Sequence, residues 1–231
     1  MQREYKKHGF FSFVPSHTDS RKKRELWCLK HGESEINCVC RVLEESRKEI
    51  KTKGGVEKVV LNGLIADYSA KIPFISWEER AQLVTDTVVQ IENAYVKRWK
   101  GLATLYIDKK ARVRVIDKDI DFPGWAELMK PKKRTIGEIV VCGGAFDVIL
   151  EGDVVSVSRS EKEGGMILDD GTGAVFLKLR EKGEGFLFGT PVKARGNVVP
   201  SGKSGYVFIA DKVKVKDAMI EEIKSFLSRY T

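Results

Sequence analysis

The chain has 231 residues, of which 42% are hydrophobic and 32% charged, and its 41 lysines and arginines exceed its 33 aspartates and glutamates to give a net charge of +8. This composition excludes a largely disordered chain, and the lack of any run of roughly 20 apolar residues excludes a helical membrane span. The first residues have no apolar signal core, so we expect an intracellular, cytoplasmic protein that does not act at a membrane.

The basic residues gather in short clusters rather than over a whole domain. Residues 1–30 hold eight basic and three acidic residues, and the clusters occupy residues 21–24, 97–100 and 130–134. Such clusters are typical either of solvated loops or of contacts with a polyanion. Charge alone leaves both interpretations open.

Strand-like runs follow one another along the chain. Apolar and polar residues alternate between turn residues, which predicts strands over residues 36–44, 58–67, 71–77, 87–97, 102–107 and 112–116. After a break at residues 121–124, the same pattern predicts strands over residues 153–160, 165–169, 174–180, 191–199 and 205–213. Apolar residues at helical spacing then predict an amphipathic helix over residues 216–230.

The two sets of strands form an internal repeat of low identity. The segment LIADYSAKIPFISW from Leu64 and the segment MILDDGTGAVFLKLR from Met166 share an apolar pair, an aspartate, a turn and an alternating strand. About five short strands per unit without βαβ alternation favour two small Greek-key barrels. We predict an N-terminal basic and aromatic extension (1–30), a first barrel (31–121), a linker (122–144) and a second barrel with the C-terminal helix (145–231). Whether the extension packs on the first barrel or on another chain stays open.

Neither metal binding nor catalysis is indicated. Free thiols are expected for the four cysteines, and although Cys28, His31, Cys38 and Cys40 could supply zinc ligands, their spacing matches no common structural zinc site. The three histidines all lie in the first 31 residues and the carboxylates are scattered among lysines. We therefore predict no metal, no cofactor and no enzymatic activity.

The first unit resembles a known family. The turn after Asp67, a third strand that ends in Trp77, and the run TVVQIENAYVKRWKGLATLYI from Thr87 are similar to the OB-folds of replication protein A, and closest in style to the archaeal single-stranded DNA-binding versions. The resemblance covers residues 36–118 well, residues 148–215 more weakly and residues 1–30 not at all. It implies a mainly β fold of two tandem five-stranded OB-fold Greek-key barrels that binds and protects single-stranded DNA in replication, recombination and repair, associated with the nucleoid.

Two departures from the family pattern have consequences. Ala70 replaces the glycine of the first turn, so this turn must avoid a positive φ. Laying Asp67 on Asp170 puts Arg180 where Trp77 stands. The second barrel can therefore bind DNA or hold a partner, and both roles stay open.

Binding of single strands requires flat aromatic faces for bases and cations for phosphates. The predicted stacking residues are Trp77, Trp99 and Tyr95. The predicted phosphate contacts are Lys71, Arg98, Lys100, Arg112 and Arg114 in the first barrel, and Lys178 and Arg180 in the second. Alternation buries Phe74 and turns Lys71 and Trp77 to the opposite face, whereas Phe176 is either on the face of Lys178 or in the core.

Two other functions remain possible. An RNA-binding OB protein would need contacts selective for the 2′-hydroxyl. An assembly subunit would use its barrels to hold partners, and in the resembled family helices after OB-folds join subunits, which implies a homo- or hetero-oligomer through the C-terminal helix. The competing interpretation makes this helix a cap on its own barrel.

Overall fold

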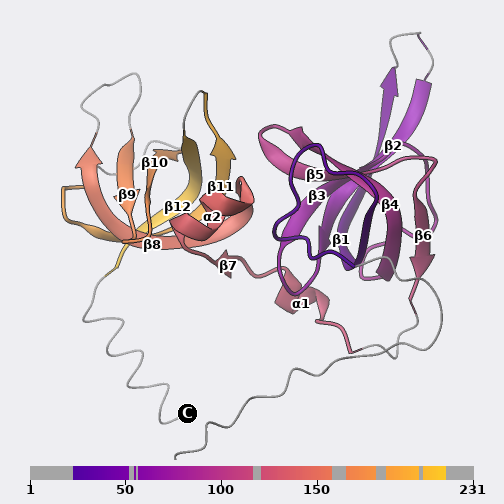
Figure 1. Cartoon of the computed structure of the whole chain (residues 1–231), viewed down its shortest axis with the longest axis horizontal. Coiled ribbons are helices and arrows are strands. Elements are labelled where there is room, and N and C mark those ends of the chain that lie inside the picture. The colour runs from indigo at the N-terminus through magenta and orange to yellow at the C-terminus, as the bar shows by residue number, and fades with distance from the viewer. Residues whose placement is uncertain are drawn as a thin grey trace, which may run out of the picture.

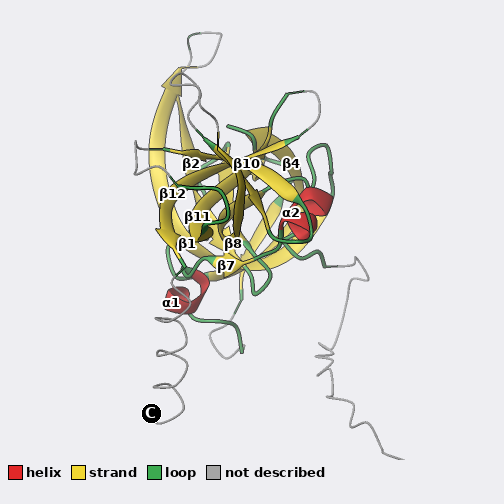
Figure 2. Ribbon diagram, turned by 90° about the vertical axis from the view of Figure 1, so that its left-hand side faces the viewer, coloured by secondary structure: helices red, strands yellow, loops and turns green. Residues whose placement is uncertain are grey.

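The computed structural model describes residues 23–51, 55, 57–116, 121–157, 165–180, 186–202 and 205–216. These residues form two β barrels side by side, joined by a short linker with one helical turn (Figure 1). The two helices lie outside the strands (Figure 2), and no helix of the described part could cross a membrane. The predicted C-terminal helix falls, apart from Lys216, outside the described residues, as does most of the N-terminal extension.

The first barrel contains every strand that the alternation predicts there. Its strands are β1 (Ile36–Lys51), β2 (Glu57–Ala66), β3 (Lys71–Ser76), β4 (Val88–Trp99), β5 (Leu102–Ile107) and β6 (Arg112–Val115). They follow the order β1-β2-β3-β5-β4, pairing of β1 with β4 closes the barrel, and β6 pairs with β4. Ile72 and Phe74 point into the core, as alternation predicts.

The second barrel repeats this topology. Its strands are β8 (Ala145–Val157), β9 (Met166–Asp169), β10 (Ala174–Leu179), β11 (Pro191–Pro200) and β12 (Tyr206–Val215). The order β8-β9-β10-β12-β11 is closed by pairing of β8 with β11. The predicted fold, mainly β with two closed five-stranded OB barrels, is confirmed.

Two strands were predicted too short: β1 continues to Lys51, beyond the predicted end at residue 44, and β8 starts before its predicted start. β8 begins at Ala145, whereas the alternation indicates a strand only from residue 153. Asp147 has a φ of 47°, and Ala145 and Val148, three residues apart, both point into the core. This irregularity interrupts the period of two, so a pattern based on alternation misses the first half of the strand.

The linker packs against both barrels. The α1 turn (Trp125–Leu128) covers the outer face of β1 and β2, because Leu128 packs with Leu43 and Ala66, and the Trp125 Nε1 donates to the Leu43 carbonyl at 2.8 Å. Strand β7 (Lys132–Lys133) pairs in parallel with β8, and α2 (Ile136–Cys142) contributes to the second core. The later part of the linker segment therefore packs with the second barrel.

Both barrels use the same turn to hold the segment that precedes their first strand. In the first, Asp67 Oδ1 accepts the Ser69 and Ala70 amides, while Asp67 Oδ2 and Ser69 Oγ accept the amides of Leu26 and Trp27. Ala70 does not have a positive φ, as expected for a turn in which alanine stands in place of glycine.

The second barrel repeats this arrangement atom for atom. Asp170 Oδ1 accepts the Thr172 amide, while Asp170 Oδ2 and Thr172 Oγ1 accept the amides of Ile136 and Gly137. Burial raises the pKa of Asp170, but hydrogen bonds from Thr172 and from backbone amides outweigh burial and lower it. The internal repeat seen in the sequence is thus a repeat of hydrogen bonds.

The described end of the N-terminal extension packs on the first barrel. Leu26 and Leu29 are buried in its core, and Trp27 contacts the cores of both barrels. Cys28 forms a disulfide with Cys142, the last residue of α2. The expectation of four free thiols is therefore wrong for this pair, because the fold brings together two cysteines 114 residues apart, a separation at which sequence spacing gives no information.

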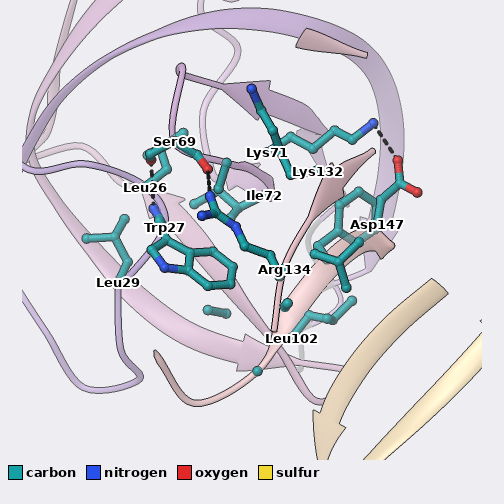
Figure 3. Close-up of a pocket in the computed structure, with 16 residues that line it drawn as sticks. Leu26, Trp27, Leu29, Ser69, Lys71, Ile72, Leu102, Lys132, Arg134 and Asp147 are labelled. Atoms are coloured by element: carbon teal, nitrogen blue, oxygen red, sulfur yellow. Dashed lines mark hydrogen bonds and ion pairs between the residues drawn. The ribbon is translucent and has the colours of Figure 1, made fainter. Parts of the chain in front are cut away.

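The barrels also meet through charged groups (Figure 3). The Arg134 guanidinium lies 4.0 Å from the centre of the Trp27 ring and donates to the Ser69 carbonyl at 2.5 Å. Lys71 of β3 pairs with Asp147 of β8 at 2.5 Å. These residues line a cavity of about 30 Å³, so the contact is nearly fully packed and leaves no room for an organic ligand.

Candidate nucleic-acid interface

The β4–β5 hairpin orders three predicted residues on one surface. Its turn has two residues, Lys100 and Gly101, with φ of 52° and 82°, which is the pattern of a type I′ hairpin. The register places Tyr95 opposite Tyr106 and Trp99 opposite Leu102. Because Ala94 and Val96 fill the core, Tyr95, Lys97 and Trp99 share the outer face.

Aromatic rings and ammonium groups alternate along this hairpin. The Tyr95 and Tyr106 rings stack with centroids 5.3 Å apart and planes 17° apart. The Lys97 Nζ lies 5.1 Å and 5.9 Å from these two ring centres, and the Lys100 Nζ lies 4.4 Å from the Trp99 ring. We call Tyr95, Lys97, Trp99, Lys100 and Tyr106 the β4–β5 strip.

The strip presents neutral rings beside positive charges. Trp99 is 46% exposed, so a large part of its ring is open to a binding partner. Burial raises the pKa of Tyr106, and the neighbouring Tyr95 raises it further.

The second barrel supports the turn of the hairpin. A Cβ atom at Gly101 would lie 2.9 Å from the Cβ of Val199 on β11, so only glycine allows this approach. The Arg98 Nη2 donates to the Gly143 carbonyl at 3.1 Å. Arg98 therefore contacts the other barrel, and Trp99 and Lys100 are carried on a braced turn, which reduces the ordering cost of binding.

The second barrel has a smaller aromatic surface of its own. Val175 and Leu177 of β10 fill the core, so Phe176, Lys178 and Arg180 face outward, which decides the question that periodicity left open. A Cβ atom at Gly165 would lie 2.4 Å from the Phe176 ring, so this ring covers Gly165. Lys178 is exposed, and the Arg180 Nε pairs with Asp211 at 2.9 Å.

The remaining predicted residues fall elsewhere. Trp77 follows β3 and is half-buried. Arg112 and Arg114 are exposed on β6, opposite Glu92 and Gln90 of β4. This is the end of β4 remote from the Trp99 turn, so the structure does not bring these two arginines into the β4–β5 strip.

The structure removes Lys71 from the set of phosphate contacts. It is only 5% exposed, and its Nζ binds Asp147 and the Met129 carbonyl. Burial raises the pKa of Asp147, but hydrogen bonds from Arg195 and Lys71 outweigh it and lower that pKa. Alternation placed Lys71 correctly on the outer face, but the second barrel covers that face.

Sequence reasoning missed Tyr106 and Lys97. A signal for both existed, because a two-residue turn at Lys100 and Gly101 fixes the register of the hairpin. That register sets Tyr106 beside Tyr95 and puts Lys97 on the same face.

Comparison with known proteins shows similarity of fold. No protein family profile and no curated protein matches the chain. Fission yeast Pot1, solved with single-stranded DNA, is similar with a TM-score of 0.55 at 10% identity, over 94% of this chain and 96% of that one. The OB domain of a Thermoplasma acidophilum protein (TM-score 0.39, 22% identity) covers 43% of this chain and 92% of its own. A replication factor A related protein from Methanobacterium thermoautotrophicum (0.35, 17%) covers 44% and 96%. The Pot1 likeness spans both barrels and supports a tandem OB architecture.

Proposed function

We propose that this protein binds single-stranded DNA through the β4–β5 strip and protects strands exposed in replication, recombination and repair. The observation that carries the proposal is the strip itself: the exposed Trp99 ring and the half-buried Tyr95 ring lie beside the Lys97 and Lys100 ammonium groups on one face of an OB barrel, and Tyr106, only 8% exposed, stacks against Tyr95 and supports it. Bases stack on such rings whatever their identity, while the ammonium groups meet the phosphates. In OB-folds, the loop between the fourth and fifth strands is a usual place for these contacts.

Single strands suit this surface better than a duplex. Stacking needs bases whose faces are free, and in a duplex the neighbouring base pairs cover them. The net charge of +8 favours any polyanion and does not by itself choose between nucleic acids. Fission yeast Pot1, whose fold is similar, was solved together with single-stranded DNA, which agrees with the proposal.

The test is a titration with oligo-dT, oligo-rU and duplex DNA of equal length while tryptophan fluorescence is followed. We expect oligo-dT to quench the emission and to bind more tightly than the duplex. Equal affinity for oligo-rU would favour an RNA-binding protein, and no binding to any of them would favour an assembly subunit.

Matched variants locate the contact. Trp99→Ala and Tyr95→Ala should each weaken oligo-dT binding by about 1–3 kcal/mol. Phe188→Ala, on the loop between β10 and β11, removes an aromatic ring that is 78% exposed but lies outside the strip, and should leave affinity unchanged. Equal losses in all three variants would contradict the assignment of the strip.

Salt dependence gives a second, independent readout. Affinity should fall steeply with salt concentration, and Lys97→Ala and Lys100→Ala should each reduce the slope of log K against log salt by about 1. A slope near zero would contradict phosphate contacts.

We further propose an oligomer through residues 216–230, tested by truncation after Asp217 and a mass measurement in solution.

A further inference from the structure

The disulfide joins two elements that are each anchored in a different barrel. Cys28 lies in the segment whose Leu26 and Leu29 fill the first core, and Cys142 ends the helix whose Ile136 and Ile139 fill the second. The free cysteines of the described residues, Cys38 and Cys40, are buried in the first core. The bond therefore connects the two cores covalently.

The bond also lies directly beside the β4–β5 strip. Gly143 follows Cys142, caps α2 with a φ of 83°, and accepts a hydrogen bond from Arg98 at 3.1 Å. Arg98 in turn precedes Trp99 on β4. One continuous series of bonds and contacts therefore runs from the disulfide to the exposed ring of the strip.

Helix α2 depends on its ends for its structure. It has seven residues, and an isolated helix shorter than about 12–15 residues is marginal in water. Its first turn is held by a capping box between Thr135 and Glu138. In its last turn Ile139 and Cys142 are buried, whereas Val140 is 43% and Val141 71% exposed, so the bond from Cys142 to Cys28 adds a covalent restraint to a turn that packs through one side only.

We propose that the Cys28–Cys142 disulfide is a redox latch that regulates the β4–β5 strip. When the bond is intact, Gly143 is held in place and Arg98 fixes the turn that carries Trp99. When the bond is reduced, the last turn of α2 frays, Arg98 loses its acceptor and the strip binds single-stranded DNA more weakly. The regulatory part of this inference rests on the proposed function.

The reductant is a dithiol of the class that keeps thiols reduced inside cells. Its thiolate attacks the sulfur of Cys28, which is partly exposed whereas Cys142 is 6% exposed, and Cys142 leaves as a thiolate that takes up a proton. The second thiol of the reductant then displaces Cys28. Two electrons and two protons pass to the protein, and the reductant becomes a disulfide.

Reduction should not separate the barrels. The Lys71–Asp147 pair, the Arg134–Ser69 hydrogen bond and the packing of Gly101 on Val199 do not involve the disulfide. The effect is therefore confined to the region of α2 and the hairpin turn. We expect a loss of affinity of at least about fivefold, the lower end of typical coupling between sites.

The experiment compares the full chain in its oxidised form and after dithiothreitol treatment. Binding of labelled oligo-dT is measured by fluorescence anisotropy, and hydrogen exchange is followed at the amides of Gly143 and Gly144, which both bond to the Ile139 carbonyl. Reduction should weaken binding at least about fivefold and speed exchange at both glycines. Exchange at Ile91, inside β4, should not change.

Variants separate the latch from a general effect of reductant. The double variant Cys28→Ser/Cys142→Ser should behave like the reduced protein in both buffers. Cys38→Ala should keep the full response, because Cys38 forms no disulfide and lies in the core of the first barrel.

Three outcomes would overturn the inference. Reactive thiols at both Cys28 and Cys142 after mild oxidation would show that the bond does not form. Unchanged exchange on reduction would show that the bond does not hold α2, and faster exchange with unchanged affinity would show that it does not regulate the strip. Absence of oligonucleotide binding in both forms would instead overturn the proposed function, and the exchange data would still decide whether the bond holds α2.

Discussion

The same kind of turn occurs once in each barrel, and it holds a different residue in each. Trp27 in the first barrel and Gly137 in the second each donate an amide to the hydroxyl of the turn, Ser69 or Thr172. A Cβ atom at Gly137 would lie 3.2 Å from Thr172, so that position has little room for a side chain, whereas the Trp27 ring reaches the cores of both barrels. In the first barrel these hydrogen bonds therefore hold a residue of the barrel–barrel contact. In the second barrel the same hydrogen bonds hold a glycine that has little room for a side chain.

The outer faces differ more than the turns do. The first barrel carries the β4–β5 strip, whose lysines lie over aromatic rings. On the second barrel Phe176 is half-buried, and the charge of Arg180 is paired with Asp211. We infer that equal topology does not imply equal binding, because the topology depends on apolar residues in the core, whereas the side chains on the outer face are free to differ in chemistry.

The largest effect is expected where the barrels meet. Asp147→Ala leaves the buried Lys71 ammonium without its carboxylate, and loss of one partner of a buried ion pair costs about 3–5 kcal/mol. Asp211→Ala removes the exposed partner of Arg180 and should cost at most about 1 kcal/mol. Urea denaturation of the full chain measures both, and equal costs would mean that the contact between the barrels is not closely packed.

The shared turn should matter more in the first barrel. Asp67 is 3% exposed and accepts hydrogen bonds from three backbone amides and from Ser69. Asp67→Ala leaves buried donors unpaired and should lower the free energy of unfolding by about 3 kcal/mol, against about 1–2 kcal/mol for Asp170→Ala, whose turn is more open to water. The two urea midpoints test this order, and a larger loss for Asp170→Ala would reverse the comparison.

Binding should depend on the first barrel more than on the second. Trp99→Ala should weaken oligo-dT binding by about 1–3 kcal/mol, and Phe176→Ala by less than about 1 kcal/mol. Fluorescence anisotropy with one labelled oligonucleotide gives both values. Equal losses would show that the strand crosses the outer faces of both barrels.

The last effect concerns acid stability and belongs to the second barrel. Hydrogen bonding from Lys133, followed by bonds from Lys216 and Lys193, lowers the pKa of Glu151 from 4.5 to about 2 against the opposing effect of burial. A folded-state pKa below that of the unfolded chain means that Glu151 stabilises the fold fully above pH 4.5 and loses this contribution as the pH falls through 2.

Glu151→Gln should therefore flatten the fall of stability between pH 4.5 and 2. Thermal unfolding across this range measures it, with Glu127→Gln on the exposed α1 turn as the control. Identical pH profiles for the wild type and Glu151→Gln would show that the three lysines do not act on this carboxyl group.

The sequence by itself determined the strands and the repeat. Alternation is a local property, so the strands of the first barrel and the inward side of Ile72 and Phe74 could be predicted from neighbouring residues alone. The aspartate turns could be recognised for the same reason, since Asp67 and Asp170 bond mainly to residues two or three positions away. Trp99, Tyr95 and Lys100 were found because they surround one turn.

Only the tertiary structure decided what the outer faces meet. Lys71 is on the face that alternation gave it, yet Asp147 from the other barrel buries it. Cys28 bonds to Cys142, which is 114 residues away in the sequence, and no local pattern indicates this partner. Local patterns determine which side of a strand a residue occupies, whereas the partner on that side comes from a distant segment and is fixed only when the two barrels pack together.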